Sequence, residues 1–90
     1  MTMEEILSKL KEQFPDEIHD SNSYFDMAKV MSNCENPDKL AIKHLYAMSK
    51  DEYTHAEAIK DILIDNGVYI PTEQLTMFDE LQERIYRKFR

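Results

Sequence analysis

The longest stretch of the chain without a glycine or a proline lies between Pro37 and Gly67. Asn36 ahead of Pro37 favours a helix start, because the asparagine oxygen can cap the helix and a first-turn proline has no hydrogen bond to lose. Gly67 after Asn66 favours a helix end, because glycine readily adopts the left-handed conformation that closes a helix. The sequence therefore predicts one helix over residues 37–66, which at 1.5 Å per residue would be about 45 Å long.

Two further helical stretches flank this helix. The first is expected to divide into a leader over residues 1–14 and a longer helix over 15–32, because Pro15 lacks an N–H and disfavours helical backbone at Phe14. The last helix is expected over residues 72–89. Its apolar residues follow one helix face: Leu75, Phe78, Leu81, Ile85 and Phe89. With a single glycine in the whole chain, this pattern predicts one all-α domain.

The balance of charge and the small size limit the partners of the chain. Its 90 residues include 18 acidic and 11 basic ones, which gives a formal net charge of -7. Negative charge repels phosphate backbones and anionic bilayers, so we expect no nucleic acid and no membrane as a partner. Glu4 and Glu5 stand where a signal peptide would be basic, and the lone Cys34 cannot form an internal disulfide. These features predict a cytoplasmic protein, and a domain of this size favours a homo-oligomer.

Two polar residues interrupt the apolar stripe of the helix over 37–66. Steps of three and four residues along one face give Ala41, His44 or Leu45, Met48, Glu52, His55, Ile59 and Ile62. Glu52 and His55 are three residues apart and point the same way, so a buried stripe would bury both. A buried carboxylate has to be neutralised, paired or bound to a metal. The alternatives are a solvated pair on a face that does not point inward, or a structural Glu–His hydrogen bond.

The helix over 15–32 has a similar interruption. One of its faces carries Phe14, Glu17, Ser21, Tyr24, Ala28 and Met31. An inward Glu17 opposite a Glu-x-x-His motif would supply one half of a carboxylate-bridged dinuclear metal site. Oxygen ligands with one imidazole per metal suit iron or manganese better than a thiolate-seeking ion. Glu17 is equally explained as a first-turn acid that favours the helix dipole, and Asp20 is then the alternative ligand.

At these residues the chain resembles the ferritin-like superfamily, most closely its rubrerythrin and encapsulated-ferritin branches. The resemblance is carried by Glu17-Ile18-His19-Asp20-Ser21-Asn22-Ser23-Tyr24-Phe25 and Asp51-Glu52-Tyr53-Thr54-His55-Ala56-Glu57-Ala58-Ile59, and it covers about residues 14–66. It implies that Glu17 and His55 are terminal metal ligands and that Glu52 bridges two metals. It also implies that Tyr24 hydrogen-bonds the metal carboxylates.

A full ferritin-like domain carries two such halves in one chain, whereas no second Glu-x-x-His follows in residues 72–89. The resemblance therefore implies a homodimer or higher homo-oligomer, in which two hairpins form a four-helix bundle with about two irons, or manganese ions, per dimer. Such a di-iron protein would act in iron oxidation or in peroxide or oxygen handling, as a ferroxidase or a rubrerythrin-like peroxidase with an electron donor still to be identified. The competing expectation is a non-catalytic acidic adaptor or inhibitor that uses the same fold to dock a basic partner.

Overall fold

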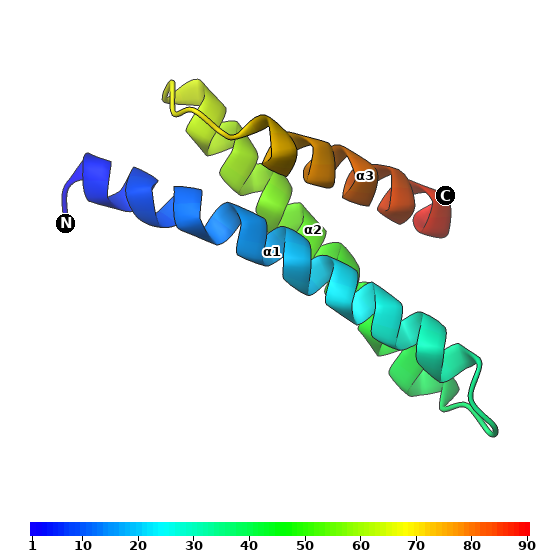
Figure 1. The fold of residues 1–90 in the computed structure, drawn as a ribbon. Helices are drawn as coiled ribbons and strands as arrows, with labels where there is room; N and C mark the ends of the chain where they lie inside the picture. Colours follow the sequence, from blue (N-terminus) through cyan, green and yellow to red (C-terminus); the bar gives the residue numbers. More distant parts are fainter.

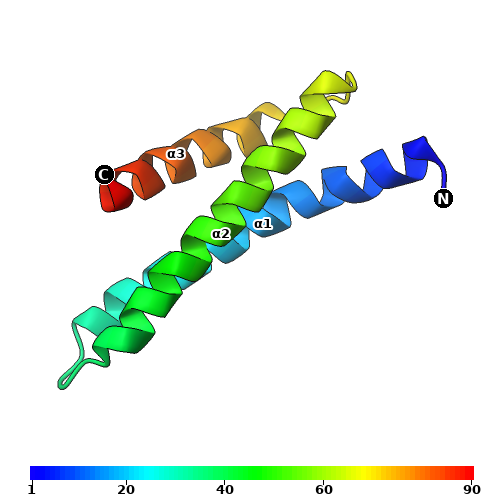
Figure 2. The ribbon, with the colours of Figure 1, turned by 180° about the vertical axis from the view of Figure 1, so that it is seen from behind.

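The chain folds into three α-helices and no strand. The structure is a computed structural model that describes all residues from Met1 to Arg90. The helices are α1 (Met3–Ser32), α2 (Lys39–Asp65) and α3 (Thr72–Phe89). Figure 1 shows α1 and α2 as an antiparallel hairpin with α3 running back along it, and Figure 2 shows from behind that the loop end of the hairpin extends beyond α3. The expected all-α class is confirmed, and none of the helices has the length and apolar character that a membrane span requires.

Helix α2 begins two residues later than expected, because a different residue caps it. The carboxylate of Asp38 accepts a hydrogen bond from the backbone N–H of Ala41 at 3.0 Å. Asn36, the expected cap, instead adopts a left-handed backbone conformation with φ 52° in the loop. Asparagine tolerates this conformation better than most residues. The loop can therefore reverse the chain and place α2 against α1.

The end of α2 agrees with the expectation from Gly67. The φ angle of this residue is 68°, and its N–H donates to the carbonyl of Ile64 at 3.0 Å. The N–H of Val68 donates to the carbonyl of Leu63 at 2.9 Å, which completes the two hydrogen bonds of a Schellman motif. The turn directs the chain back over the hairpin, where Ile70 joins the buried core.

Helix α1 runs through Pro15 without a break, which differs from the expected boundary at Phe14. A proline inside a helix costs about 3 kcal/mol through the lost hydrogen bond and the clash of its ring. Phe14 and Ile18, on either side of the proline, are fully buried. Leu7 and Leu10, in the expected leader, pack against the same core. Burial of one continuous apolar face therefore outweighs the local preference of the proline.

Helix α3 covers one side of the hairpin. Its buried residues are Phe78, Leu81 and Ile85, as expected, whereas Phe89 at the helix end is 40% exposed. We call the side of the hairpin that contacts α3 the covered flank and the opposite side the open flank. The α1 and α2 residues that contact α3 through rings or polar groups are Phe14, Asn22, Phe25, Asp26, Tyr46, Lys50, Tyr53 and Lys60.

Candidate metal centre

The buried face of α2 is rotated by about one residue from the expected stripe. Its buried residues are Ser49, Tyr53, Ala56, Ile59 and Leu63. The side chain of Glu52 is 22% exposed and that of His55 is 58% exposed, so the expectation that both are buried is wrong for the histidine. The reason is α3: the ring of Tyr53 stacks on that of Phe78 with centroids 5.5 Å apart, which turns this side of α2 inward.

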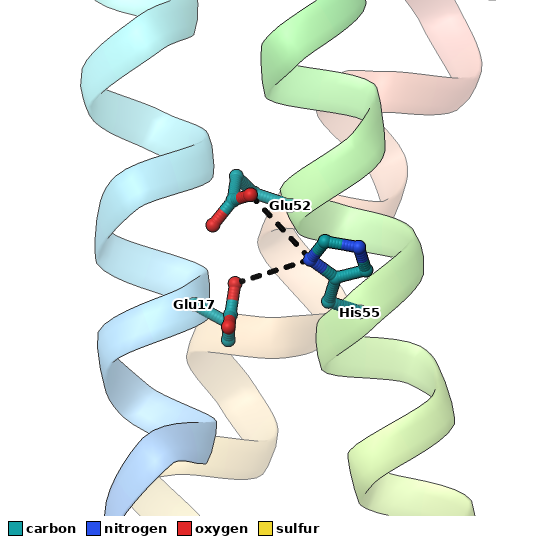
Figure 3. Close-up of side chains that lie close together, drawn as sticks. All are labelled: Glu17, Glu52 and His55. Carbon is teal, nitrogen blue, oxygen red and sulfur yellow. Dashed lines mark ion pairs between the residues drawn. The ribbon is translucent and has the colours of Figure 1, made fainter.

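The polar residues of interest lie on the open flank. At about 100° per residue, Glu17 is about 140° around α1 from Asn22, and His55 is about 160° around α2 from Tyr53. Asn22 and Tyr53 both contact α3. Figure 3 shows Glu17 reaching from α1 toward Glu52 and His55 on α2, with α3 behind the two helices.

Three side chains converge at this place. One ligand atom from each of Glu17, Glu52 and His55 lies within 4.8 Å of the other two. The Nδ1 atom of His55 is 3.4 Å from Oε1 of Glu52 and 3.6 Å from Oε2 of Glu17 (Figure 3). Asp20, the alternative ligand, is exposed and lies outside this cluster. The fold thus assembles the three residues that the spacing singles out.

The two carboxylate oxygens of Glu17 have different surroundings. The residue is 8% exposed, and Oε1 accepts a hydrogen bond from Nε2 of Gln13 at 2.8 Å. The other oxygen, Oε2, is buried and accepts no hydrogen bond while Glu52 is ionised, although a protonated Glu52 or His55 can donate to this carboxylate. A buried polar atom without a partner costs about 1–3 kcal/mol, and more when it carries charge. This oxygen, which faces His55, is therefore the least satisfied atom of the cluster.

The two carboxyl groups titrate together. Burial raises the pKa of Glu17, but hydrogen bonding with Glu52 and Gln13 and the charge of His55 outweigh burial, so that the pKa is lowered overall. The pKa of Glu52 is raised to about 7 because it can share a proton with Glu17, because it is partly buried, and because Glu17 is negative. The charge of Asp20 adds to this rise and His55 opposes it. The pair therefore favours one shared positive charge, which a proton or a metal cation can supply.

Gln13 is a member of the site that the sequence-based expectations omit. The break expected at Phe14 separates it from Glu17, whereas the continuous α1 places it one turn earlier on the same face. Tyr24, expected to hydrogen-bond the carboxylates, is half-buried and makes no hydrogen bond to Glu17, Glu52 or His55 in the structure. Its role stays a prediction for the metal-bound state.

Comparisons with known proteins add no relative. No protein-family model, no curated protein and no solved structure matches the chain. The class that fold and site define is an all-helical protein with a Glu/Glu/His cluster suited to a metal ion.

Proposed function

We propose that the chain is a ferritin-like carboxylate metal protein whose dinuclear iron site is completed when two copies pair, and that it acts in iron oxidation or in peroxide or oxygen handling. One observation carries this proposal. The buried Oε2 atom of Glu17 has no hydrogen-bond partner and lies 3.6 Å from Nδ1 of His55, in a cluster that includes Glu52. A cation held among the three groups would satisfy this oxygen and relieve the repulsion between the carboxylates.

The donor set fits iron. Two carboxylates and one imidazole are the composition of one half of a carboxylate-bridged site, and such ligands favour iron or manganese over soft, thiolate-seeking ions. Cys34, the one cysteine, is exposed in the loop between α1 and α2 and offers no thiolate to the cluster. The same donor set admits manganese, so metal analysis has to include both ions.

The shape of the open flank supports pairing of two copies. Glu52 stands at the middle of α2, with the partly exposed Leu45 and Met48 before it and Ile62 after it on the same side, whereas Ile59 is 6% exposed and belongs to the core. In a two-fold dimer, residue i of one copy contacts residue j of the other and the reverse, so apolar residues before Glu52 in one copy can meet apolar residues after Glu52 in a second, antiparallel copy. Met48 and Ile62 are each 41% exposed in the single chain and would be covered in such a pair. Two hairpins paired in this way would form a four-helix bundle, with both Glu52 residues near the two-fold axis.

The family resemblance implies a separate role at the metal site for each of these residues. Glu17 and His55 would be terminal ligands and Glu52 the bridge, while Gln13 holds the Glu17 carboxylate in place through its 2.8 Å hydrogen bond. Glu52, whose pKa is raised to about 7, would release its proton near neutral pH as the cation binds. A bound iron pair would supply two electrons, one from each ion, to oxygen or peroxide.

The proposal is tested by loading the metal-free protein with Fe(II) without oxygen and then mixing it with oxygen or peroxide in a stopped-flow instrument. The wild type should bind about two irons per dimer and oxidise them faster than free Fe(II) at the same pH. Glu52→Ala should lose both properties, whereas Asp20→Ala, an exposed acid outside the cluster, should keep both. Wild-type iron content in both Glu52→Ala and His55→Ala would contradict the ligand assignment. If iron binds but is oxidised no faster than free iron, the metal site is supported and the proposed role in iron oxidation is contradicted.

Pairing is tested by light scattering at micromolar concentration with metal supplied. The wild type should be a dimer, and Ile62→Lys should be a monomer, because a charge buried in the apolar part of the interface is costly. Ile64→Lys is the matched control: Ile64 is 53% exposed, but two residues further along α2 it points away from the open flank. A wild-type protein that stays monomeric with metal would contradict the dimeric site.

A further inference from the structure

A hollow lies across α2 from the metal centre, between α2 and the last turns of α3. It has a volume of about 290 Å³ and is lined by Lys50, Tyr53, Thr54, Ile85, Tyr86, Phe89 and Arg90. Pockets for small molecules begin at roughly 300 Å³. The hollow therefore has room for a molecule of one or two rings.

Aromatic side chains form much of its wall. The rings of Tyr53 and Tyr86 meet edge to face, with centroids 6.2 Å apart and planes 77° apart. Tyr53 is 5% exposed and forms part of the floor, whereas Tyr86 and Phe89 are 48% and 40% exposed. Large aromatic side chains left half-exposed beside a hollow offer ring faces on which a planar ligand can stack.

The charge of the wall is opposite to that of the chain. Lys50 and Arg90 are the only charged residues lining the hollow, although the chain has 18 acidic and 11 basic residues. Each of the other two hollows on the molecule is lined by at least one carboxylate. Lys50 is absent from the ion pairs of the chain, and its Nζ lies 4.9 Å from the centre of the Phe89 ring. An unpaired ammonium group beside aromatic rings selects for a ligand that is both aromatic and negative.

We propose that this hollow binds a planar aromatic anion of one or two rings, with the rings against Tyr86 and Phe89 and the negative group beside Lys50. The inference is independent of the metal centre, because none of the lining residues is a proposed metal ligand. It also gives the covered flank a binding role of its own, separate from its role in holding α3.

The test uses 2-naphthoate and its neutral analogue 2-naphthamide as probes, titrated into the full chain and followed by amide NMR shifts. We expect saturable shifts at Thr54 and Ile85, and naphthoate should bind about fivefold more tightly than naphthamide, as one exposed charge contact allows. Lys50→Met should remove this preference. Lys60→Met is the matched control, since Lys60 also lies over a ring of α3, that of Phe78 at 4.6 Å, but outside the hollow.

The aromatic wall is tested separately. Phe89→Leu keeps an apolar side chain but removes the flat ring, and it should weaken both probes several-fold without lowering the unfolding temperature, because the residue is half-exposed. The proposal is overturned by the absence of saturable binding, by shifts that map elsewhere, or by equal affinity for the two probes. It is equally overturned if Lys60→Met weakens naphthoate as much as Lys50→Met does, or if Phe89→Leu binds both probes like the wild type.

Discussion

The two flanks of the α1–α2 hairpin differ in how far their central polar groups are hydrogen-bonded. On the covered flank, the hydroxyl of Tyr53 donates to Glu57 and accepts from Gln82, both at 2.9 Å. On the open flank, Oε2 of Glu17 is buried without a partner, and the nearest nitrogen, of His55, is 3.6 Å away. The Tyr53 hydroxyl on the covered flank is thus satisfied within one chain, although Oε1 of Gln74 on α3 is buried without a partner, whereas on the open flank the unpartnered atom belongs to a buried carboxylate.

This difference separates the residues that hold the fold from those that are available for chemistry. Satisfied hydrogen bonds and close-packed rings specify how α3 docks. Because the pKa of Glu52 is raised to about 7 beside Glu17, ionising both carboxyl groups lowers the stability of the metal-free chain. We therefore expect substitutions on the covered flank to destabilise the protein, and substitution of the shared-proton pair on the open flank to stabilise its metal-free form.

The largest effect is expected at the centre of the covered flank, for Phe78→Ala. The Phe78 ring is 1% exposed and lies 6.0 Å from the ring of Phe14 and 5.5 Å from that of Tyr53. Removing a buried phenylalanine ring costs about 3–5 kcal/mol, because apolar contacts are lost and a cavity remains. Urea unfolding at a fixed protein concentration measures the loss, and Phe78→Leu gives a smaller value if the alanine variant does not fold.

Met77→Ala is the control for this substitution. Met77 precedes Phe78 on α3 but is 41% exposed, so the change should cost less than about 1 kcal/mol. Equal losses for the two variants would mean that α3 does not pack on the hairpin as described. The claim that packing of α3 stabilises the covered flank would then be contradicted.

A smaller effect of opposite sign is expected on the open flank, for Glu52→Gln in the metal-free protein. The pKa of Glu52 is raised from 4.5 to about 7 in the folded chain, first because it can share a proton with Glu17. Between these pH values the folded state holds a proton that the unfolded state has released, so the free energy of unfolding falls as the pH rises. Glutamine cannot lose a proton and can still donate to Glu17, so the variant should avoid this fall.

The measurement is a series of urea unfolding curves from pH 4.5 to pH 8 in the presence of a chelator. The two proteins should be similar at the acid end, and the variant should be more stable by about 2 kcal/mol at pH 8. Titrating groups outside the cluster affect both proteins alike, so the difference reports the coupled Glu17–Glu52 pair. Parallel curves over the whole range would show that the pair does not share a proton and would remove the contrast between the flanks.

Local signals were enough to predict most of the fold. Gly67 ends α2 because only its left-handed φ of 68° allows the two closing hydrogen bonds, and this depends on neighbouring residues alone. Pro15 shows where such reasoning fails. Its local preference is real, but the burial of Phe14 and Ile18 on either side of it is a tertiary effect that a sequence window does not contain.

The candidate site, like the fold, was predictable from the sequence only in part. Two features depend only on helix geometry: the i,i+3 spacing of Glu52 and His55, and the position of Glu17 on the same face of α1 as buried apolar residues. The sequence therefore predicts the cluster. The exposure of His55 depends on which side of α2 is drawn inward, and that is decided by the stacking of Tyr53 on Phe78 in a helix far along the chain. The hydrogen bond from Gln13 depends in turn on the continuity of α1 through Pro15.

The smallest expected effect is also the sharpest test of the separation, because Tyr53 and Glu52 are neighbours in sequence that lie about 100° apart around α2, one toward each flank. Tyr53→Phe removes the hydroxyl between Glu57 and Gln82 and should cost about 1 kcal/mol of unfolding free energy. Tyr86→Phe should cost nearly nothing, because its exposed hydroxyl only accepts a 3.4 Å contact from Gln82. If the flanks are independent, Tyr53→Phe binds iron as tightly as the wild type in an anaerobic titration. A tenfold loss of iron affinity would mean instead that the polar contacts of α3 position Glu52 through the helix, and that the two flanks form one functional unit.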